Sequence, residues 1–485
     1  MLCITGLEST LEDVERRIKL SKQKLGDTPH LHELRVDALR ASREEIKGFF
    51  TTYADILLVC CRPKRQGGQY DGAENIRLNR LRDAAAAHVA YLDVEADLAK
   101  SDIESLKLSD TTKLIVSWHD FRGLPADMLA LCQKMRALGA DIVKLAVSVR
   151  EMTSLKRLLD LNDQLDSPTI LIAMGENGVL SRIRYYDFGS PWTYICYHRD
   201  DASAPGQLCL DDAMRFGMPD STRHNFCALV GGPQVKHSWG PDVYNAFFKA
   251  ADINMSYVAI SSTKAEACFD LMHRIGAKGL SVTMPFKKNA YDYGLSQESA
   301  SHSGAANTLF WPRPGMQPLS YNTDIQGVKV PLAKAIAALP KNPRRVLILG
   351  AGGVARAAVL ACRELDLTVL ISARRFSQAA DLSTALSTGR PIDWSQRDQC
   401  EAEILINATP CSGSDTSPWP EDSPIVADIV FDLAITGQNS LLVARAKVSN
   451  AIGISAQEMW LAQGARQISI FTGTKVEPDQ LRSYL

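Results

Sequence analysis

Short apolar runs alternate with longer charged stretches through the first 200 residues of the chain. Runs this apolar are typical of parallel strands that helices cover on both faces, because neither face of such a strand meets water. The charged stretches between them carry helical spacing, as in LEDVERRIKLSKQKL at Leu11–Leu25. About eight strand-helix units predict a closed (β/α)8 barrel, the TIM barrel, with an open doubly wound sheet as the alternative. The apolar runs lie at 2–5, 32–36, 56–61, 89–94, 114–118, 142–147, 169–174 and 192–197.

A second α/β region begins after these runs. The polar, turn-rich segment FGMPDSTRHNF at 216–226 is followed by a new apolar run, CALVGG, at 227–232. This change predicts a domain boundary near residue 220. Residues 344–375 give an apolar strand, the glycine turn GAGGVA, an alanine-rich helix and a second apolar strand. That order predicts a Rossmann dinucleotide-binding unit.

The glycine turn of this unit has the composition that a bound pyrophosphate needs. Gly350 allows the tight turn, Gly352 lets the backbone approach the ligand, and the small Ala355 lets the helix pack on the strand. The second strand ends at Arg374 and Arg375, with no carboxylate for the ribose hydroxyls. An acid there would repel a 2′-phosphate, whereas Arg374 can bind it, so the sequence predicts NADP rather than NAD. A tight turn without a ligand is the alternative.

Composition and charge exclude several classes of function. The 485 residues are 46% hydrophobic and 22% charged, with a formal net charge of −1, and at roughly 150 residues per domain they predict two or three domains. A near-neutral chain without a block of like charges lacks the basic surface of a nucleic-acid binder. The sequence shows no signal peptide, no apolar stretch of roughly 20 residues, and no C-x-x-C spacing among its eleven cysteines. We therefore expect a cytoplasmic protein with buried thiols, no membrane contact and no metal site.

Lys144, in DIVKLAV at 141–147, is the most informative residue of the first half. The apolar residues that flank it would disfavour an ammonium and favour a neutral amine, which can attack a carbonyl. As alternatives, the lysine reaches the barrel mouth or pairs structurally with Glu33. His119, in KLIVSWHDF, can relay protons near neutral pH, although a lone histidine at a strand end is more often only a hydrogen-bonding group. Lysine and histidine on adjacent strands of one barrel together favour catalysis.

Seven segments of residues 1 to 215 resemble type I 3-dehydroquinate dehydratase, in the order of that family. In the family a lysine forms an imine with the C3 ketone of 3-dehydroquinate, while a histidine removes a C2 proton and assists loss of the C1 hydroxyl. The resemblance assigns these roles to Lys144 and His119, without a cofactor. Gln66 stands where the family often has Glu, for which we expect a small effect on closure of the substrate loop. The segments are ELRVD at 33–37, CRPKRQGG at 61–68, YLDVE at 91–95, SWHDF at 117–121, DIVKLA at 141–146, GVLSR at 178–182 and SAPGQ at 203–207. The family's substrate contacts carry over to Glu33, Arg35, Arg62, Arg182, Ser203 and Gln207.

Two further segments present a lysine and an aspartate ahead of the glycine turn. They are GLSVTMPFKK at 279–288, with Lys287, and YNTDIQG at 321–327, with Asp324. Such a pair can hold and protonate a carbonyl oxygen as hydride arrives. A surface ion pair of little consequence is the alternative, and spacing alone does not decide between them.

The chain from about residue 228 to its end resembles shikimate dehydrogenase. That family reduces 3-dehydroshikimate to shikimate with NADPH, and the resemblance assigns its paired catalytic residues to Lys287 and Asp324. The segments are GGPQVKHSWGPDVYNAFF at 231–248, GLSVTMPFK, GAANT at 304–308, NTD at 322–324, GAGGVAR, INATP at 406–410 and EMWLAQGARQI at 458–468. The substrate ligands carry over to Ser238, Thr283, Asn307 and Gln463, and the cofactor side carries over to Gly350, Gly352, Gly353, Arg374 and Asn407.

Several positions depart from the shikimate dehydrogenase pattern. The family often has a second serine at Gly240, an asparagine at Ser281, a tyrosine at Ile435 and a Gly-Met pair at Ser412 and Gly413. Loss of the two hydroxyls at 240 and 435 removes up to two substrate hydrogen bonds of roughly 1 kcal/mol net each. We expect weaker substrate affinity, or looser discrimination toward molecules like quinate.

The two resemblances predict one chain that carries out two consecutive steps of the shikimate route, on 3-dehydroquinate and then 3-dehydroshikimate. A regulator that senses its ligand without turning it over is the alternative from another class, but such a descendant would be free to lose the catalytic lysines, the histidine and Asp324. A quinate dehydrogenase using NAD is a further alternative, against which Arg374 argues. The expected domains are a dehydratase barrel at 1–220, a substrate-binding domain at 227–330 and 453–485, and a Rossmann NADP-binding domain at 331–452.

Overall fold

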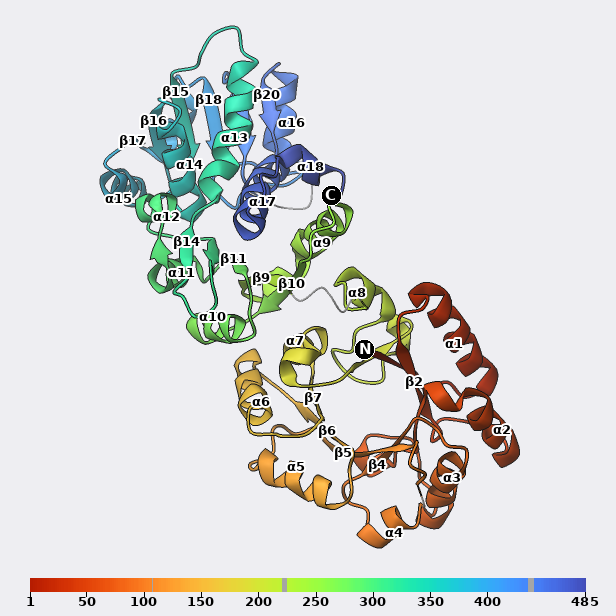
Figure 1. Ribbon diagram of the computed structural model, residues 1–485. Coiled ribbons are helices and arrows are strands. Elements are labelled where there is room, and N and C mark those ends of the chain that lie inside the picture. Colours follow the sequence, from red (N-terminus) through yellow and green to blue (C-terminus); the bar gives the residue numbers. More distant parts are fainter. Residues whose placement is uncertain (107, 220–224, 435–439) are drawn as a thin grey trace. The chain divides into compact units, whose positions relative to one another are not determined.

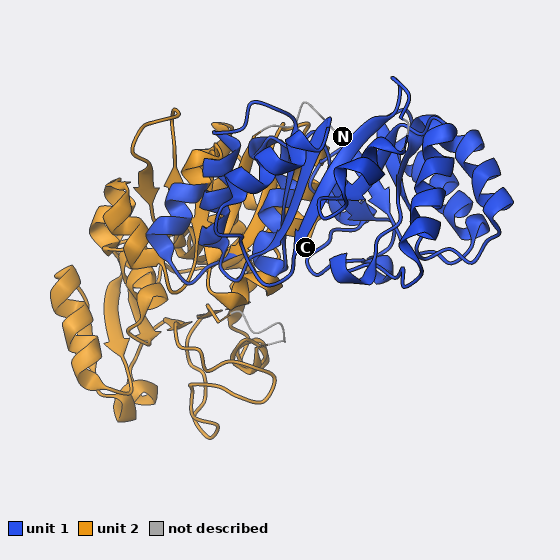
Figure 2. Ribbon diagram, turned by 90° about the horizontal axis from the view of Figure 1, so that it is seen from below, with its two compact units in different colours: residues 1–224, 261–271 blue, residues 225–260, 272–485 orange. Residues whose placement is uncertain are grey.

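The computed structural model describes residues 1–106, 108–219, 225–434 and 440–485 (Figure 1). The chain divides into two compact units, which Figure 2 shows in different colours. Unit 1 contains Met1–His224 and Ser261–Leu271, and unit 2 contains Asn225–Ile260 and Met272–Leu485. The domain boundary that the sequence predicts near residue 220 falls at 220–224, outside the described residues.

Unit 1 is a (β/α)8 barrel. Its strands form one parallel sheet in the order β7-β6-β5-β4-β3-β2-β1-β8, so each strand lies beside its neighbour in sequence and β8 returns to pair with β1. This circular order excludes the doubly wound alternative, in which the strand order reverses. Among the described residues no strand pairing joins β7 to β8. The strands are β1 (Leu2–Thr5), β2 (His30–Arg35), β3 (Leu57–Cys60), β4 (Tyr91–Glu95), β5 (Lys113–Asp120), β6 (Ile142–Ser148), β7 (Thr169–Met174) and β8 (Thr193–Cys196).

The helices of unit 1 cover the barrel from outside, between successive strands (Figure 1). Local sequence sets where several of them begin. The side chain of Thr10 accepts the main-chain N–H of Asp13 at the start of α1, and Ser42 and Glu45 form a capping box at the start of α2. The helices are α1 (Leu11–Leu25), α2 (Arg43–Tyr53), α3 (Glu74–Ala86), α4 (Lys100–Glu104), α5 (Met128–Ala137), α6 (Leu155–Asn162), α7 (Val179–Ile183) and α8 (Leu210–Arg215).

Alternation along the strands decides which side chains fill the barrel. Ile142 and Ala146 of β6 belong to an interior apolar cluster. Lys144 lies two residues from each, so it points to the same side, whereas Val143 and Leu145 point outward to the helices. The two-residue period therefore brings a charged side chain into the interior from a strand that reads as almost wholly apolar.

Unit 2 contains a mixed sheet in the order β10-β9-β11-β13-β14-β12. Strands β9 and β11 are parallel, while β13 runs antiparallel to both β11 and β14. The strands are β9 (Phe226–Gly231), β10 (Ser256–Ser261), β11 (Gly279–Val282), β12 (Leu295–Ser296), β13 (Thr308–Phe310) and β14 (Leu319–Tyr321). The helices in this part of unit 2 are α9 (Gly240–Ala250), α11 (Lys287–Tyr293) and α12 (Glu298–Ser303). Helix α10 (Ala265–Arg274) is divided between the units, because residues 265–271 belong to unit 1.

The second sheet of unit 2 is parallel, in the order β17-β16-β15-β18-β19-β20. Numbered within the sheet, this order is 3-2-1-4-5-6, that of a Rossmann fold. Helices α13 and α17 pack against each other beside it (Figure 1). The strands are β15 (Arg345–Leu349), β16 (Thr368–Ser372), β17 (Arg390–Ile392), β18 (Ile404–Asn407), β19 (Ile429–Asp432) and β20 (Ile452–Ile454). The helices are α13 (Asp324–Ala337), α14 (Gly353–Arg363), α15 (Phe376–Leu386), α16 (Leu441–Val448), α17 (Ala456–Thr472) and α18 (Pro478–Arg482).

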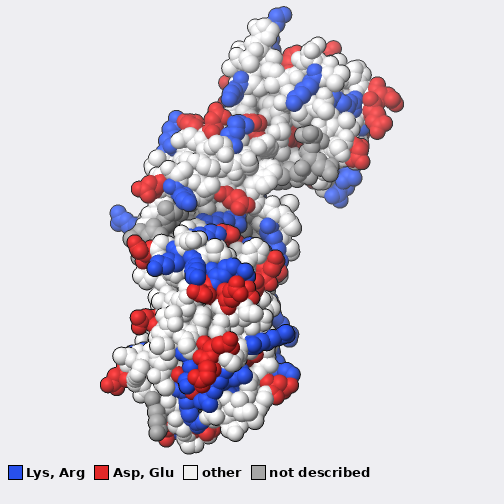
Figure 3. Space-filling view, turned by 90° about the vertical axis from the view of Figure 1, so that its right-hand side faces the viewer, with Lys and Arg blue, Asp and Glu red and all other residues white. Residues whose placement is uncertain are grey.

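The surface and the cysteines agree with the composition. On the face that Figure 3 shows, acidic and basic side chains are interspersed. All cysteines are free thiols, and all but Cys400 and Cys411 are buried, as the sequence predicts. Among the described residues no helix is both long and apolar enough to span a bilayer.

Candidate active sites

Lys144 and His119 face the barrel interior from two neighbouring strands. In the parallel pairing of β5 with β6, Ser117 is opposite Lys144 and His119 is opposite Ala146. Because side chains alternate along a strand, both residues point inward, two positions apart. Lys144 is only 4% exposed, so the amine lies inside the barrel and not in solvent at its mouth.

Carboxylates surround the amine of Lys144. Its Nζ is 3.0 Å from Asp93 Oδ2 and 3.7 Å from Glu33 Oε1, and it lies 4.1 Å above the centre of the Tyr194 ring. The expected apolar surroundings are therefore wrong for this amine, because the apolar neighbours in sequence occupy the outer face of β6. The pairing with Glu33 that the sequence left open is present, but Asp93 is closer.

Arg62 connects two acids at the end of β4. Its guanidinium lies 2.8 Å from Asp93 Oδ2 and 2.8 Å from Glu95 Oε1. Burial alone would raise the pKa of Asp93, yet Arg62 and Lys144 hold it below its ordinary value. Burial does raise the pKa of Glu95, in spite of Arg62 and Arg77. Asp93 is thus the more firmly ionised of the two acids.

His119 has the properties of a proton acceptor. Burial lowers the pKa of its ring well below the ordinary value, and the nearby positive charges of Arg62 and Lys144 lower it further. Its buried Nδ1 has no hydrogen-bond partner among the described residues. The main-chain N–H of His119 donates to Gln66 Oε1 at 3.1 Å. The imidazole ring of His119 stacks on the ring of Phe121, with 6.4 Å between the ring centroids. The imidazole is consequently neutral at pH 7 and can take up a proton.

Arg182 is a buried cation without an ion-pair partner among the described residues. It is 3% exposed, its Nε has no partner, and its Nη1 reaches only the carbonyl of Tyr194, at 3.4 Å. Burial lowers its pKa to about 10. Arg35, by contrast, is already held by Asp37 through two hydrogen bonds of 3.0 and 2.7 Å. A buried guanidinium left uncompensated in this way fits an anionic ligand.

Ser203 and Gln207 lie in the loop between β8 and α8. Ser203 donates its main-chain N–H and its hydroxyl to Gln207 Oε1, at 2.7 and 3.0 Å. The carboxyl ends of parallel strands meet at one end of a barrel. This loop therefore lies at the same end as Arg62 and His119, which also follow or end their strands.

The lysine and aspartate of unit 2 are in contact. Lys287 Nζ is 2.5 Å from Asp324 Oδ2, and the aspartate side chain is 9% exposed against 28% for the lysine. Asn307 Nδ2 donates to the other oxygen, Asp324 Oδ1, at 2.9 Å, and lies 3.5 Å from Gln463 Oε1. A carboxylate that is largely buried and held by an amide is not a simple surface ion pair.

Gln467 is a residue of this site that the sequence analysis missed. Its Oε1 accepts from Tyr244 at 3.0 Å and from Ser281 at 2.8 Å, while its Nε2 donates to the carbonyl of Asn307 at 3.1 Å. Its spacing from Gln463 could have indicated this position, because residues four apart lie on one face of a helix, here α17. Asp93 of the barrel lies within the segment YLDVE at 91–95 and was assigned no role from the sequence.

The glycine turn after β15 has room for a ligand. Gly350 has a φ of +113°, and a Cβ there would lie 2.7 Å from the carbonyl oxygen of Ala408. A Cβ at Gly352 or at Gly353 would meet no atom within 4 Å, so the chain leaves open space beside its exposed backbone. Ala355 is fully buried against the strand. This arrangement fits a bound pyrophosphate.

Two other residues predicted on the cofactor side differ in their surroundings. Arg374, after β16, is exposed. Asn407 is fully buried, and its amide donates to the carbonyl of Cys411 at 3.1 Å and to Asp432 Oδ1 at 2.9 Å. Its Oδ1 accepts the main-chain N–H of Thr409 at 2.9 Å. Asn407 thus organises the loop after β18 through contacts within the chain.

Comparisons with known proteins identify the family. The model of type I 3-dehydroquinase matches residues 2–216, and the model of the shikimate dehydrogenase substrate binding domain matches residues 230–309. The chain is 30% identical over 476 residues to the chloroplastic bifunctional 3-dehydroquinate dehydratase/shikimate dehydrogenase of Arabidopsis thaliana, with 91% of this chain and 77% of that protein covered. The chain belongs to this bifunctional family.

A further relative matches almost the whole chain, and a solved structure matches about half of it. The shikimate biosynthesis protein AroDE of Chlamydia trachomatis is 26% identical, and the match covers 98% of this chain and 95% of that protein. Shikimate 5-dehydrogenase (AroE) of Thermus thermophilus, solved in complex with NADP(H) and shikimate, is 25% identical with a TM-score of 0.47, over 53% of this chain and 97% of that chain.

In the bifunctional enzyme, Tyr257 lies beside Gly240, one of the positions that depart from the shikimate dehydrogenase pattern. A Cβ at Gly240 would lie 2.9 Å from Cε1 of Tyr257 and 3.3 Å from Oγ of Ser238. Tyr257 is 2% exposed, so its ring fills the space that a serine at 240 would need. Ser281, the second departure, hydrogen-bonds to Gln467 as described above. The third, Ile435, lies outside the described residues.

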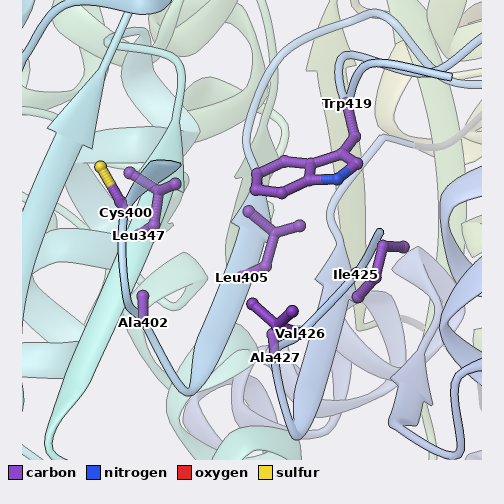
Figure 4. Close-up of a pocket in the computed structure, with 8 residues that line it drawn as sticks. All are labelled: Leu347, Cys400, Ala402, Leu405, Trp419, Ile425, Val426 and Ala427. Carbon is purple, nitrogen blue, oxygen red and sulfur yellow. The ribbon is translucent and has the colours of Figure 1, made fainter. Parts of the chain in front are cut away.

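The bifunctional enzyme also has a small apolar pocket in its Rossmann sheet (Figure 4). Strands β15 and β18 form one side of it, and Trp419 lies across it. The only polar side-chain groups in its lining are the Cys400 thiol and the Trp419 indole, which donates to the carbonyl of Pro424 at 3.4 Å. This lining does not suit a carboxylate or a phosphate. The lining residues are Leu347, Cys400, Ala402, Leu405, Trp419, Ile425, Val426 and Ala427.

Proposed function

We propose that this chain dehydrates 3-dehydroquinate to 3-dehydroshikimate in its barrel and reduces 3-dehydroshikimate to shikimate with NADPH in unit 2. The observation that most directly supports the first step is the buried amine of Lys144 near the neutral imidazole of His119, on one face of the barrel. We further propose that residues 1–220 form the dehydratase domain, 227–330 and 453–485 the substrate-binding domain, and 331–452 the NADP-binding domain.

In the dehydration, the amine of Lys144 forms an imine with the C3 ketone, and one water leaves. The protonated imine withdraws electrons and so acidifies the hydrogens on C2. His119 accepts one of these protons, and the electron pair moves into the imine to give an enamine. The enamine returns the pair to form the C1–C2 double bond as the C1 hydroxyl departs. His119 returns the proton to that hydroxyl, which leaves as water. Hydrolysis of the imine consumes one water and restores the amine, so the net reaction removes one water.

Arg182 supports an acidic substrate in the barrel. Its guanidinium is buried and unpaired in the described chain, so a substrate carboxylate would supply the missing counter-charge. We assign the remaining substrate contacts of the dehydratase to polar side chains at the same end of the barrel. They are Glu33, Arg35, Arg62, Ser203 and Gln207.

In the reduction, bound NADPH would supply a hydride to the carbonyl carbon of 3-dehydroshikimate. Lys287 and Asp324 hold the carbonyl oxygen between them and provide the proton that it gains. Asn307 fixes the orientation of Asp324 through the hydrogen bond to Oδ1. We assign substrate binding in unit 2 to Ser238, Thr283, Asn307 and Gln463.

The residues of the glycine turn fit NADPH. The open space at Gly352 and Gly353 leaves main-chain N–H groups at the start of α14 for the pyrophosphate. Arg374, exposed and with no acid at the end of β16, is available to the 2′-phosphate. Gly350 and Ala355 shape the turn, and Asn407 positions the loop after β18.

A coupled assay tests the proposal. Purified chain given 3-dehydroquinate and NADPH should oxidise NADPH and form shikimate, and NADH should replace NADPH only poorly. Formation of 3-dehydroshikimate without NADPH oxidation would overturn the second activity. No conversion of 3-dehydroquinate at all would overturn the first.

Two lysine variants separate the sites. Lys144→Met should abolish dehydration but leave the reduction of added 3-dehydroshikimate intact, and Lys287→Met should do the reverse. Borohydride added with 3-dehydroquinate should leave a covalent adduct on Lys144, located by peptide mass. An unmodified Lys144 peptide from active enzyme would contradict the imine.

A further inference from the structure

Asp93 is a carboxylate that three side-chain donors hold in the interior of the barrel. Its side chain is fully buried, and both of its oxygens accept hydrogen bonds. Oδ1 accepts from the hydroxyl of Ser117 at 2.6 Å, while Oδ2 lies 2.8 Å from Arg62 and 3.0 Å from Lys144. A carboxylate with three donors in this geometry is fixed in place before any substrate arrives.

Glu33 is the second carboxylate near the lysine, but it is held differently. Its Oε1 is 3.7 Å from Lys144 Nζ. Its other oxygen accepts a hydrogen bond from the hydroxyl of Thr5, and no arginine side chain is paired with it among the described residues. Asp93 is therefore the anion closest to the nitrogen of Lys144, and its position is determined by groups other than that lysine.

We propose that Asp93 is the counter-ion of the protonated imine that Lys144 forms with its ketone substrate. The inference rests on the proposed function. The protonated amine and the ketone give the protonated imine and one water, so the positive charge on nitrogen is the same before and after the step. Asp93 consequently keeps its charge throughout and stabilises the form of the imine that withdraws electrons from C2.

The hydrogen bonds on Asp93 exclude a role as the proton acceptor. Both of its oxygens already accept hydrogen bonds, Oδ1 from Ser117 and Oδ2 from Lys144. Burial would raise its pKa, but Arg62 and Lys144 hold the pKa below the ordinary range. His119, which is neutral and has an unpartnered ring nitrogen, remains the group that moves protons. Asp93 on β4 therefore serves as the counter-ion of the imine, and His119 on β5 transfers the protons.

Several other titratable or charged groups face this pair from the surrounding strands. They set the background against which the effect of Asp93 is measured, and all of them stay in place in the Asp93→Asn variant. They are Cys3 of β1, Glu33 and Arg35 of β2, Cys60 of β3, Arg62 after β3, Glu95 of β4, His119 of β5 and Tyr194 of β8.

The test is Asp93→Asn, with Glu95→Gln as the matched control. Glu95 is equally buried, lies on the same strand and pairs with the same Arg62, but it is not in contact with Lys144. The readout is the rate of borohydride trapping of Lys144 with 3-dehydroquinate as a function of pH, because borohydride reduces the protonated imine. Reduction of 3-dehydroshikimate by the same preparations reports on unit 2.

Trapping should decline at alkaline pH, where the imine loses its proton. In Asp93→Asn we expect this alkaline decline to move to lower pH and the dehydratase kcat to fall about 100-fold. Trapping at acidic pH should persist, which shows that the site is folded. Glu95→Gln should leave the alkaline decline where it is in the unchanged enzyme. An unchanged decline in Asp93→Asn, or an equal shift in Glu95→Gln, would overturn the counter-ion.

The unchanged enzyme provides a second measurement that requires no variant. Its alkaline decline should lie at higher pH than that of the imine formed in solution by butylamine and 3-dehydroquinate. Coincidence of the two would also overturn the counter-ion. Absence of any trapped Lys144 in the unchanged enzyme would instead overturn the proposed dehydratase mechanism, so the two failures are distinguishable.

Discussion

Asn307 donates a hydrogen bond of 2.9 Å to Oδ1 of Asp324, while Lys287 contacts Oδ2 at 2.5 Å. The amide of Asn307 thus holds one oxygen of the Asp324 carboxylate, and the ammonium of Lys287 holds the other. Asn307 lies beside the last residue of β11, since the main-chain N–H of Val282 donates to the carbonyl of Asn307 at 2.7 Å. The orientation of Asp324 therefore depends on the mixed sheet of unit 2 as well as on α13.

Removal of that amide should impair the reductase alone. In Asn307→Ala the buried Oδ1 of Asp324 loses its donor, which costs about 1–3 kcal/mol. We expect the kcat for reduction of 3-dehydroshikimate to fall roughly 10- to 100-fold. NADPH oxidation measures it, and dehydratase activity in the same sample is the control. Equal loss of both activities would indicate misfolding rather than loss of the contact.

The dehydratase should remain active below the ordinary titration range of histidine. Burial, together with Arg62 and Lys144, lowers the pKa of His119, so its neutral, proton-accepting form persists as pH falls. The acid limb of kcat/KM for 3-dehydroquinate should accordingly lie below pH 6.5. His119→Asn should remove both the limb and most of the activity. An acid limb at or above pH 6.5 would contradict the role of His119.

His32 should make the stability of unit 1 depend on pH. Burial lowers its pKa to about 2, with Arg17 and His30 adding to the effect. An unfolded chain binds the proton near pH 6.5, so stability is full above that pH and is lost as pH falls through the interval between about 6.5 and 2. At pH 5 the loss is about 2 kcal/mol. Urea unfolding at pH 7 and 5 measures it, and His32→Gln should flatten the dependence.

Restoring the family's serine at Gly240 should disturb this enzyme. The new Cβ would lie 2.9 Å from the ring of Tyr257, and overpacking of this kind costs about 1–3 kcal/mol. We expect Gly240→Ser to lower the thermal midpoint of unit 2 and to raise the KM for 3-dehydroshikimate. Addition of Tyr257→Ala should recover part of the midpoint. An unchanged midpoint in the single variant would show that the ring moves freely.

Two glycines of the nucleotide turn should respond differently to alanine. Gly350→Ala places a Cβ 2.7 Å from the carbonyl oxygen of Ala408, at a φ of +113°, so we expect loss of stability. Gly352→Ala meets no atom of the chain within 4 Å, so the fold should persist while the Kd of NADPH rises. Calorimetric titration and thermal unfolding of both variants measure the contrast. Unchanged NADPH binding in folded Gly352→Ala would contradict the pyrophosphate site.

The sequence predicted the barrel well because its signal is local. All eight apolar runs of the first half are strands, with ends shifted by at most two residues. The barrel was favoured over an open sheet on strand number alone. What decides it is the pairing of β8 with β1, a contact between the two ends of unit 1 that no local pattern contains.

The surroundings of Lys144 show where local reasoning ends. Its neighbours in sequence, Val143 and Leu145, suggested an apolar environment, but the strand turns them to the outer face. The groups that contact its amine come from β2, β4 and β8: Glu33, Asp93 and Tyr194. Periodicity identifies the face on which a side chain lies but not the residues opposite it.

By itself, the sequence determined the α/β class, the positions of the strands, the glycine turn and most of the polar residues at strand ends, because these depend on residues close together in the chain. Only the tertiary structure decided that Asp93 contacts Lys144, that Tyr257 fills the space at Gly240, and that Gln467 links Tyr244 and Ser281. Such contacts follow from strand register and helix packing, which bring together side chains that lie far apart in the sequence.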